Sequence, residues 1–211
     1  MKSIEVKLYK FNELSEEVKE KVLNNWRTND DYWFTEDANK TFERFADLFN
    51  IAWQNIDYCE PYRNDYKIKL SDDVLYLSGS RLCAYIWNNY KNDLFPKKYL
   101  KSFDGHKKHK NIVNYTAKNT GKKYCNYYSS IKKDNSCVLT GVCYDDDILS
   151  PIYEFLNKPS DRIDFETLLN DCIYSLCASV NAEIEYQSSE EAITETIEAN
   201  DYDFTEDGKL Y

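Results

Sequence analysis

The longest regular pattern of apolar positions in the chain lies between Asp164 and Tyr186. Apolar residues recur there every three or four positions, which is the period of an α-helix with one buried face. The stripe consists of Phe165, Leu168, Leu169, Cys172, Leu176, Cys177, Val180 and Ile184, and Ile173 widens it. Asp164 precedes the stripe, and its carboxylate can accept hydrogen bonds from the free N–H groups of the first turn. We therefore predict a core helix over residues 164–186.

The N-terminal half of the chain mixes alternating and helical patterns. Residues 2–11 alternate, with Ile4, Val6 and Leu8 on one side, which predicts a strand with one apolar face. The other elements predicted in this half are a helix over 15–27 capped by Ser15, a helix over 36–49 capped by Thr35 and ended by Asn50, a strand over 51–58, a hairpin of 66–70 and 74–78 turning at Ser71, Asp72 and Asp73, and a helix over 81–95.

The C-terminal half adds a strand and two further helices. Residues 137–144 predict a strand. Asp145, Asp146 and Asp147 are expected to begin a short helix, in which Pro151 is tolerable only in the first turn. Ser188 and Glu191 form a capping-box pair for a helix that ends near residue 200.

This order of elements predicts an α+β fold. We expect a mostly antiparallel sheet of four to six strands, packed by helices, with the core helix lying on the sheet that contains the N-terminal strand. The 211 residues include only 5 Gly and 4 Pro, which argues against barrels and sandwiches, and 16% aromatic residues, which argues against disorder. We expect one domain over 1–211, with an irregular lysine-rich insertion over 97–133.

Charge is distributed very unevenly along the chain. The net charge is −10, yet residues 97–133 contain eleven lysines and one acid, so that the rest of the chain carries −20. Residues 183–207 contain ten acids and neither Lys nor Arg. One interpretation is a solvated acidic surface with a basic loop folded over it. The other is that one or both patches meet a charged partner, because clustered charge attracts opposite charge over a long range.

Each patch suggests its own binding residues. An acidic face formed by Glu190, Glu191, Glu195 and Glu198 would suit the basic nucleic-acid-binding groove of another protein. The lysine-rich loop, with tyrosines interleaved, would suit a phosphate-bearing ligand such as a small nucleotide. The lysines expected to bind it are Lys107, Lys108, Lys110, Lys122 and Lys123. The acidity of the whole chain argues against general DNA binding.

Candidates for catalysis and metal binding are weak. His106 and His109 are three residues apart, but lysines flank them and Gly105 disfavours a helix. Asp145, Asp146 and Asp147 could hold Mg²⁺ with phosphates, although acids in the first turn of a helix explain them more simply. Glycine-rich phosphate loops are absent, and cysteine catalysis would need a nearby base. We therefore expect a protein that is not an enzyme and needs no cofactor or metal.

The compartment follows from segments that the sequence lacks. There is no run of 18 apolar residues, and the N-terminus alternates and is charged, unlike a signal peptide. Seven cysteines without a C-x-x-C pair suit reduced thiols. We expect a cytoplasmic protein that does not associate with membranes.

Two end segments carry a family resemblance. Residues Ile4–Glu17, IEVKLYKFNELSEE, resemble the opening of small bacteriophage and prophage proteins from AT-rich bacteria, and residues Glu191–Tyr211 resemble their ending. This is a largely uncharacterised family, and some of its members are labelled antitoxin-like. The resemblance implies a phage accessory protein acting in the host bacterial cell. It includes no catalytic motif and assigns no residue a role.

Together these observations favour a phage accessory protein that counters a host defence system by non-enzymatic binding. Its acidic face would enter the groove of a defence effector, such as a nuclease, and inhibit it. Three alternatives remain open. The lysine-rich loop could sequester a nucleotide second messenger, the chain could be an antitoxin-like protein that neutralises a toxin, or Asp145–Asp147 could serve a metal-dependent nuclease or phosphodiesterase.

Overall fold

The structure is a computed structural model that describes residues 6–28, 32–95, 112–116, 123–127, 137–141 and 144–211, with side chains described except at 33, 112–116 and 123–127. Within these residues the chain is mostly helical. The helices are α1 (Glu16–Arg27), α2 (Trp33–Phe49), α3 (Asp72–Leu75), α4 (Gly79–Leu94), α5 (Tyr144–Asn157), α6 (Phe165–Gln187) and α7 (Glu190–Ala199), with 3₁₀ turns η1 (Phe11–Glu13) and η2 (Pro61–Arg63).

The predicted sheet of four to six strands is wrong. The described residues contain two separate two-stranded antiparallel sheets. In one, β1 (Ile51–Trp53) pairs with β2 (Tyr66–Ile68), and Ala52 lies opposite Lys67. In the other, β3 (Ile112–Thr116) pairs with β4 (Lys123–Tyr127) inside the lysine-rich segment. Helix-to-helix packing replaces the expected packing of helices on a sheet.

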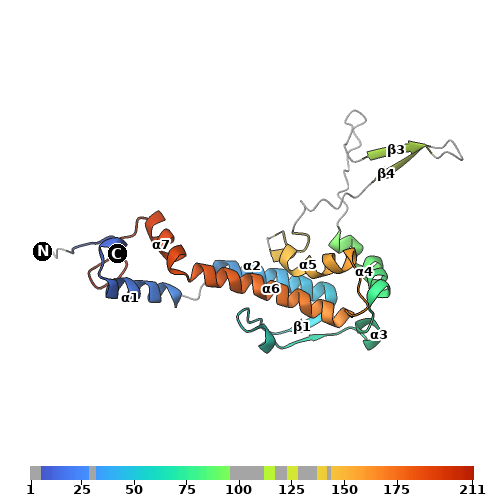
Figure 1. Cartoon of the computed structure of the whole chain (residues 1–211), viewed down its shortest axis with the longest axis horizontal. Helices are drawn as coiled ribbons and strands as arrows, with labels where there is room; N and C mark the ends of the chain where they lie inside the picture. The colour runs from blue at the N-terminus through green and yellow to red at the C-terminus, as the bar shows by residue number, and fades with distance from the viewer. Residues whose placement is uncertain (1–5, 29–31, 96–111, 117–122, 128–136, 142–143) are drawn as a thin grey trace.

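The main core surrounds α6, as the apolar stripe predicts. Helix α6 packs against α5 and α2, and α4 and β1 complete the cluster (Figure 1). Its stripe is buried from Phe165 to Val180, whereas Ile184 is only partly buried. Asp164 caps α6 as predicted, because its Oδ1 accepts a hydrogen bond from the Thr167 N–H at 2.8 Å. The predicted core helix is therefore confirmed, but its neighbours are helices.

Pro151 lies inside α5 and not in its first turn, so this prediction is wrong. A proline there has no N–H to donate to the carbonyl four residues earlier, which belongs to Asp147. The Ser175 hydroxyl of α6 donates to that carbonyl at 2.7 Å. A side chain of the neighbouring helix thus replaces the missing backbone hydrogen bond, and the proline is tolerated within the best-packed helix pair.

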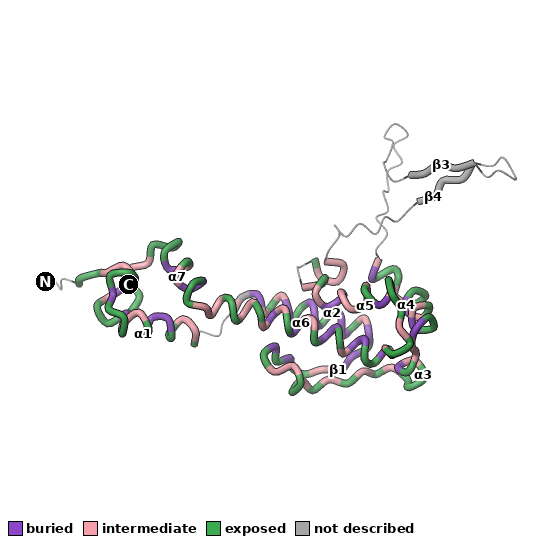
Figure 2. The backbone as a smooth tube through the Cα atoms, viewed as in Figure 1, coloured by how far each residue is buried: buried purple, intermediate pink, exposed green. Residues whose placement is uncertain are grey.

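A second, smaller core joins the two ends of the chain. Residues 6–28 and 189–211, called the terminal module below, lie together at one end of an elongated molecule (Figures 1 and 2). Its buried apolar side chains are Phe11, Leu14, Val22, Leu23, Ile193, Ile197 and Phe204. Helix α6 connects this module to the main core. The N-terminal segment 6–17 and the C-terminal segment 191–211 therefore lie within one structural unit.

Backbone bonds and close packing fix the terminal module. The Tyr9 N–H donates to the Phe204 carbonyl at 2.8 Å, and the Phe204 N–H donates to the Tyr9 carbonyl at 2.9 Å. Gly208 has a φ of 84°, and a Cβ there would lie 2.9 Å from Val18 Cγ1. A glycine is therefore needed where the tail turns over α1. The predicted strand over 2–11 is reduced, within residues 6–11, to the bridge at Tyr9, and residues 1–5 lie outside the described part.

Two further strand predictions are wrong, because the residues with alternating apolar and polar positions form other hydrogen bonds. The hairpin predicted over 66–78 does not form, since β2 pairs back to β1 and Ser71 begins the short helix α3. The strand predicted over 51–58 ends at Trp53. Beyond it, Asp57 and Asn64 close a loop, in which the Asp57 N–H donates to Asn64 Oδ1 at 2.6 Å and Asn64 Nδ2 donates to the Asp57 carbonyl at 3.1 Å.

Helix boundaries are close to the predictions, with three changes at their starts. Helix α2 starts at Trp33, and the Thr35 hydroxyl donates back to the Tyr32 carbonyl instead of capping. Asn50 ends α2 as predicted, with a left-handed φ of 55°. Ser189, one residue after the predicted Ser188, caps α7 by accepting from the Ala192 N–H at 3.2 Å. Helix α4 also starts two residues early, at Gly79.

Candidate functional site

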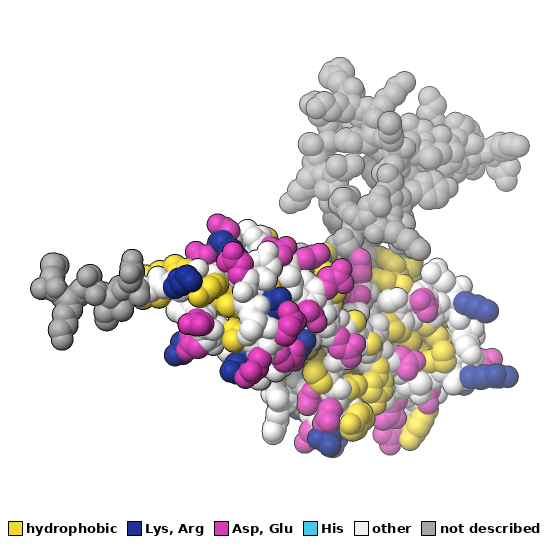
Figure 3. Space-filling view, turned by 60° about the vertical axis from the view of Figure 1, so that its left-hand side comes forward, with side chains coloured by type: hydrophobic (Ala, Val, Ile, Leu, Met, Phe, Trp, Pro, Cys, Tyr) yellow, Lys and Arg dark blue, Asp and Glu magenta, His cyan; other side chains and the backbone are white. Residues whose placement is uncertain are grey.

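The four predicted acidic residues lie together on α7. Glu190, Glu191, Glu195 and Glu198 are all exposed. At 100° per residue they occupy an arc of about 140°, with Thr194 between Glu190 and Glu198, and the buried side chains of α7 lie on the remaining arc. We call these glutamates and Thr194 the acidic face. Figure 3, which brings the terminal module forward, shows acidic side chains gathered over this part of the surface.

The carboxylates of the acidic face are not neutralised by neighbours. None of the four glutamates is in an ion pair or a side-chain hydrogen bond with any residue that the structure describes. On α1 the situation differs, because Glu16 pairs with Lys19 at 2.8 Å and Glu17 pairs with Lys21 at 3.4 Å. Unpaired negative charge in the terminal module is therefore concentrated on α7.

Only part of this arrangement favours the helix itself, because Glu190 and Glu191 lie in the first turn, where the helix dipole stabilises acids. Glu195 and Glu198 lie toward the C-terminal end of α7, where the helix dipole favours cations, and the last turn contains no basic residue. Glu191 and Glu195 are also like charges four positions apart, which costs a helix about 0.2–0.5 kcal/mol. A sequence optimised for helix stability alone would place lysines at some of these positions.

The acidic face rests on a fixed support. Ile193 and Ile197 anchor α7 in the small core, against α1 and the chain ends. Arg27 Nε donates to the Ser188 carbonyl at 3.2 Å, which joins the end of α1 to the start of α7. Lys10 Nζ lies 2.8 Å from both Asp201 Oδ1 and Asp203 Oδ1 and ties the N-terminal segment to the residues after α7. Four exposed carboxylates are thus displayed on a helix that is held at both ends.

The surface of the acidic face is shallow and open. A wide hollow is lined by Glu190, Glu191, Thr194 and Glu195. Such a surface does not enclose a small ligand, whose site would normally bury most of the ligand's area. It suits a basic surface of a macromolecule, which can surround the projecting helix with its own cations.

The lysines expected to bind phosphate belong to the lysine-rich segment 97–133. Lys107, Lys108, Lys110 and Lys122 lie outside the described residues, as do His106 and His109. Lys123 is the first residue of β4 and pairs with Thr116 of β3. The described part of the insertion thus contains an antiparallel strand pair, although the segment was expected to be irregular.

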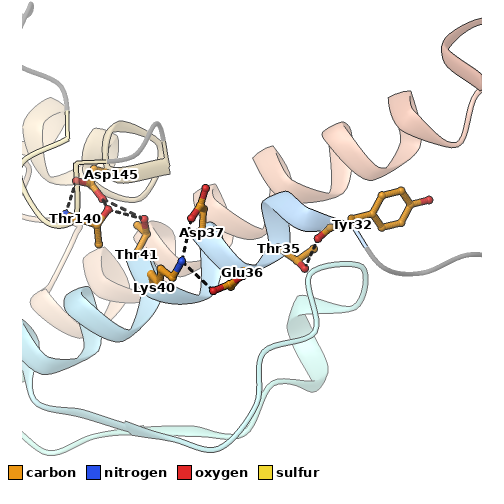
Figure 4. Close-up of polar contacts among 8 residues, drawn as sticks. All are labelled: Tyr32, Thr35, Glu36, Asp37, Lys40, Thr41, Thr140 and Asp145. Carbon is orange, nitrogen blue, oxygen red and sulfur yellow. Dashed lines mark hydrogen bonds and ion pairs between the residues drawn. The ribbon is translucent and has the colours of Figure 1, made fainter. Parts of the chain in front are cut away.

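The three consecutive aspartates at the start of α5 have different environments. Asp145 is completely buried, and its two carboxylate oxygens accept five hydrogen bonds of 2.7–3.2 Å. The donors are the N–H groups of residues 139–141 and the hydroxyls of Thr41 and Thr140, and Figure 4 shows the side-chain part of this network, beside the surface pairs of Lys40. Asp145 therefore fastens the 137–141 segment to α2 and α5.

This role explains why the strand predicted over 137–144 is wrong, since residues 137–141 form bends around the Asp145 carboxylate. Asp146 is exposed, and burial raises the pKa of the Asp147 carboxyl above its ordinary value. Successive helical residues point about 100° apart, so three neighbouring aspartates do not converge on one ion. Within the described residues, no group of three or more His, Cys, Asp or Glu side chains is arranged to hold a metal.

The two cysteines of the α6 stripe belong to the core. Both Cys172 and Cys177 are fully buried. Burial raises the pKa of the Cys172 thiol well above its ordinary value and that of Cys177 to about 11. A thiol in this state is a poor nucleophile, because the reactive species is the thiolate.

The sequence pattern found the four glutamates but missed their surroundings. Spacing along α7 was enough to place them on one face, because a helix converts spacing into direction. The support from Lys10, Asp201 and Asp203 depends on contacts between the two chain ends, which no local pattern reveals. Asp145 was missed as a buried residue because its donors are mostly backbone groups.

The described residues include no helix long and apolar enough to cross a membrane. Comparison of the whole chain with protein-family models, curated proteins and solved structures finds no match.

Proposed function

We propose that this chain is a non-catalytic binding protein that presents the acidic face of α7 to a basic groove of another protein. The single observation that carries the proposal is the set of four exposed, unpaired glutamates on one arc of a supported helix, placed partly against the helix dipole. Charge of one sign on a protruding surface steers a partner of opposite charge and fixes its orientation.

A nucleic-acid-binding groove is the partner surface that fits this charge best. Such grooves are lined with Lys and Arg that neutralise a row of phosphates. The carboxylates at Glu191, Glu195 and Glu198 follow each other along the helix at about 4.5–6 Å of rise, so they can occupy several cations of one groove at once. The resemblance of the chain ends to phage proteins directs the search to nuclease effectors of bacterial defence. Blocking their groove would inhibit them without any chemistry.

The test is affinity capture from a bacterial lysate with the whole tagged chain, followed by mass spectrometry and a nuclease assay. We expect the wild-type chain to capture a basic nucleic-acid-binding protein in stoichiometric amount and to inhibit its binding or cleavage of nucleic acid. The variant E190K/E191K/E195K/E198K should lose both effects. The control variant E43K/E154K changes two exposed glutamates on α2 and α5, away from the acidic face, and should retain both.

Two results would overturn the proposal. Capture and inhibition that survive reversal of the four glutamates would show that α7 is not the contact surface. Recovery of a nucleotide in place of a protein, lost when Lys107, Lys108, Lys110, Lys122 and Lys123 are neutralised, would favour the sequestering alternative. High salt should weaken either complex, so salt dependence alone does not distinguish them.

A further inference from the structure

The outer face of α4 has the opposite charge from most of the described surface. Arg81 and Lys91 are exposed, and neither forms an ion pair with any residue in the described ranges. Asp93 is the one acid of α4, and it is two positions from Lys91, so it points about 160° away from it. Taking 100° per residue, Lys91 points about 80° from Arg81, and Trp87 lies about 40° beyond Lys91. The three side chains therefore share an arc of about 120° on α4, which we call the cationic strip.

Trp87 is exposed but held in place. It retains 45% of its accessible surface, which is high for a tryptophan in a folded chain. Its ring lies 5.5 Å from that of Phe95, and the Phe95 ring lies 5.4 Å from that of Tyr153. The Tyr153 hydroxyl donates to the Leu94 carbonyl at 3.0 Å, which completes the support. An aromatic side chain fixed in this way loses little entropy on binding, and Trp and Arg are frequent anchors of protein interfaces.

The acidic face of α7 is complementary to this strip in charge and length. Its hollow is lined by Glu190, Glu191, Thr194 and Glu195. Arg81 and Lys91 can pair with glutamates of this face, and Trp87 can pack beside the pair that Lys91 makes. Arg81 and Lys91 are about 15 Å apart along α4, and Glu190 and Glu198 are about 12 Å apart along α7, a difference that long Arg and Lys side chains accommodate.

Within one copy these surfaces cannot meet, because α4 and α7 lie at opposite ends of the elongated molecule (Figure 1). We propose that the chain self-associates, with the α4 strip of one copy docked on the acidic face of α7 of a second copy. The two surfaces differ, so the contact is heterologous. A docked copy covers the acidic face and competes with the partner proposed above, but the self-contact does not depend on that partner.

The test is sedimentation velocity of the whole chain over a range of concentrations, in about 0.15 M and about 1 M NaCl. We expect the average sedimentation coefficient to rise with concentration at the lower salt and to stay constant at the higher salt. Variants R81E/K91E and E191K/E195K should each remain monomeric. Their equimolar mixture should associate again, because the first variant retains the acidic face and the second retains the cationic strip.

Matched controls separate this contact from a general effect of charge. K67E/K69E and E43K/E154K change the same numbers of charges at exposed positions of other elements and should associate like the wild-type chain. Trp87→Ala keeps the charge and should weaken association by about tenfold or more, as loss of an interface anchor does. Circular dichroism of every variant should match that of the wild-type chain.

A wild-type chain that stays monomeric at every concentration would overturn the inference, and so would a mixture of the two charge variants that fails to associate. These failures would leave the lysate experiment unaffected. If instead the chain self-associates through α7 but captures no foreign protein from the lysate, the inference is supported and the proposed function is contradicted.

Discussion

The hydrogen bond from Ser175 to the Asp147 carbonyl predicts that two distant positions in the sequence are energetically coupled. With Pro151 present, this carbonyl has no backbone donor within α5, and Ser175 supplies one across the helix pair. Ser175→Ala should leave the carbonyl unsatisfied. The cost of an orphaned, partly buried acceptor is about 1–3 kcal/mol, and the lower end applies here because Asp147 is not fully buried.

Pro151→Ala supplies the missing N–H to the same carbonyl. In that background Ser175→Ala should cost less, because the acceptor retains a partner, and we expect a coupling energy of about 0.5–1.5 kcal/mol. The four chains of the cycle should be compared by urea unfolding followed by circular dichroism. A difference of 1 kcal/mol corresponds to about 2–4 °C in melting temperature for a chain of this size, which thermal scans also detect.

The matched control is Ser179→Ala. Ser179 lies one turn further along α6 and hydrogen-bonds the Asp147 carboxylate, not its carbonyl. The loss of stability caused by Ser179→Ala should therefore be the same with Pro or Ala at position 151. The reasoning is refuted if Ser175→Ala costs the same in both backgrounds, within about 0.3 kcal/mol, or if Ser179→Ala shows the same coupling.

Three further predictions concern stability and its dependence on pH. Leu176→Ala should destabilise the chain by about 2–5 kcal/mol, because it opens a cavity in the main core, and a melting temperature within one degree of wild type would contradict the packing of α6. Gly208→Ala should also destabilise the chain, by about 1–2 kcal/mol, because the alanine would have to adopt a left-handed φ of 84° and its Cβ would crowd Val18. Unfolding monitored by Trp26 fluorescence should report this loss of stability. Asp147→Asn should stabilise the chain near neutral pH, because the raised pKa of this carboxyl means that its charged form is disfavoured in the folded state. That gain should disappear as pH falls through the raised pKa, where the wild-type carboxyl becomes neutral, and a gain independent of pH would contradict the assignment.

Strong periodicity predicted the helices but not what they pack against. The stripe of α6 and its cap at Asp164 are confirmed because a wide apolar face and a capping carboxylate act within one or two turns. Helix α1 begins directly after Ser15 as predicted, but the Ser15 side chain makes no capping hydrogen bond. The alternating segments over 2–11, 66–78 and 137–144 resemble strands, but an alternating segment becomes a strand only when a partner strand lies beside it. Within the described residues, Tyr9 has one bridge to Phe204, residues 66–68 pair with β1 and not with 74–78, and residues 137–141 bend around Asp145.

The site shows the same division between local and long-range information. The four glutamates share one helix, so their spacing alone placed them on one face. The sequence does not distinguish the cations of α4 from other surface cations, because only the tertiary fold shows which cations lie together and unpaired. The sequence places Asp145 in an acidic first turn but does not predict its burial, since its donors at 139–141 and Thr41 are brought to it by the tertiary fold.

The small core that contains both chain ends determines the order in which the two cores can form during synthesis. Its N-terminal half, including Phe11 and Leu23, leaves the ribosome long before Phe204 is made. At about 5–20 residues per second, those apolar side chains wait on the order of 10 to 40 s for their partners. Helix α6 and the main core can assemble during that interval, so the acidic face becomes a supported surface only after Phe204 has been made. A chain interrupted before residue 204 would keep its main core and lack that surface.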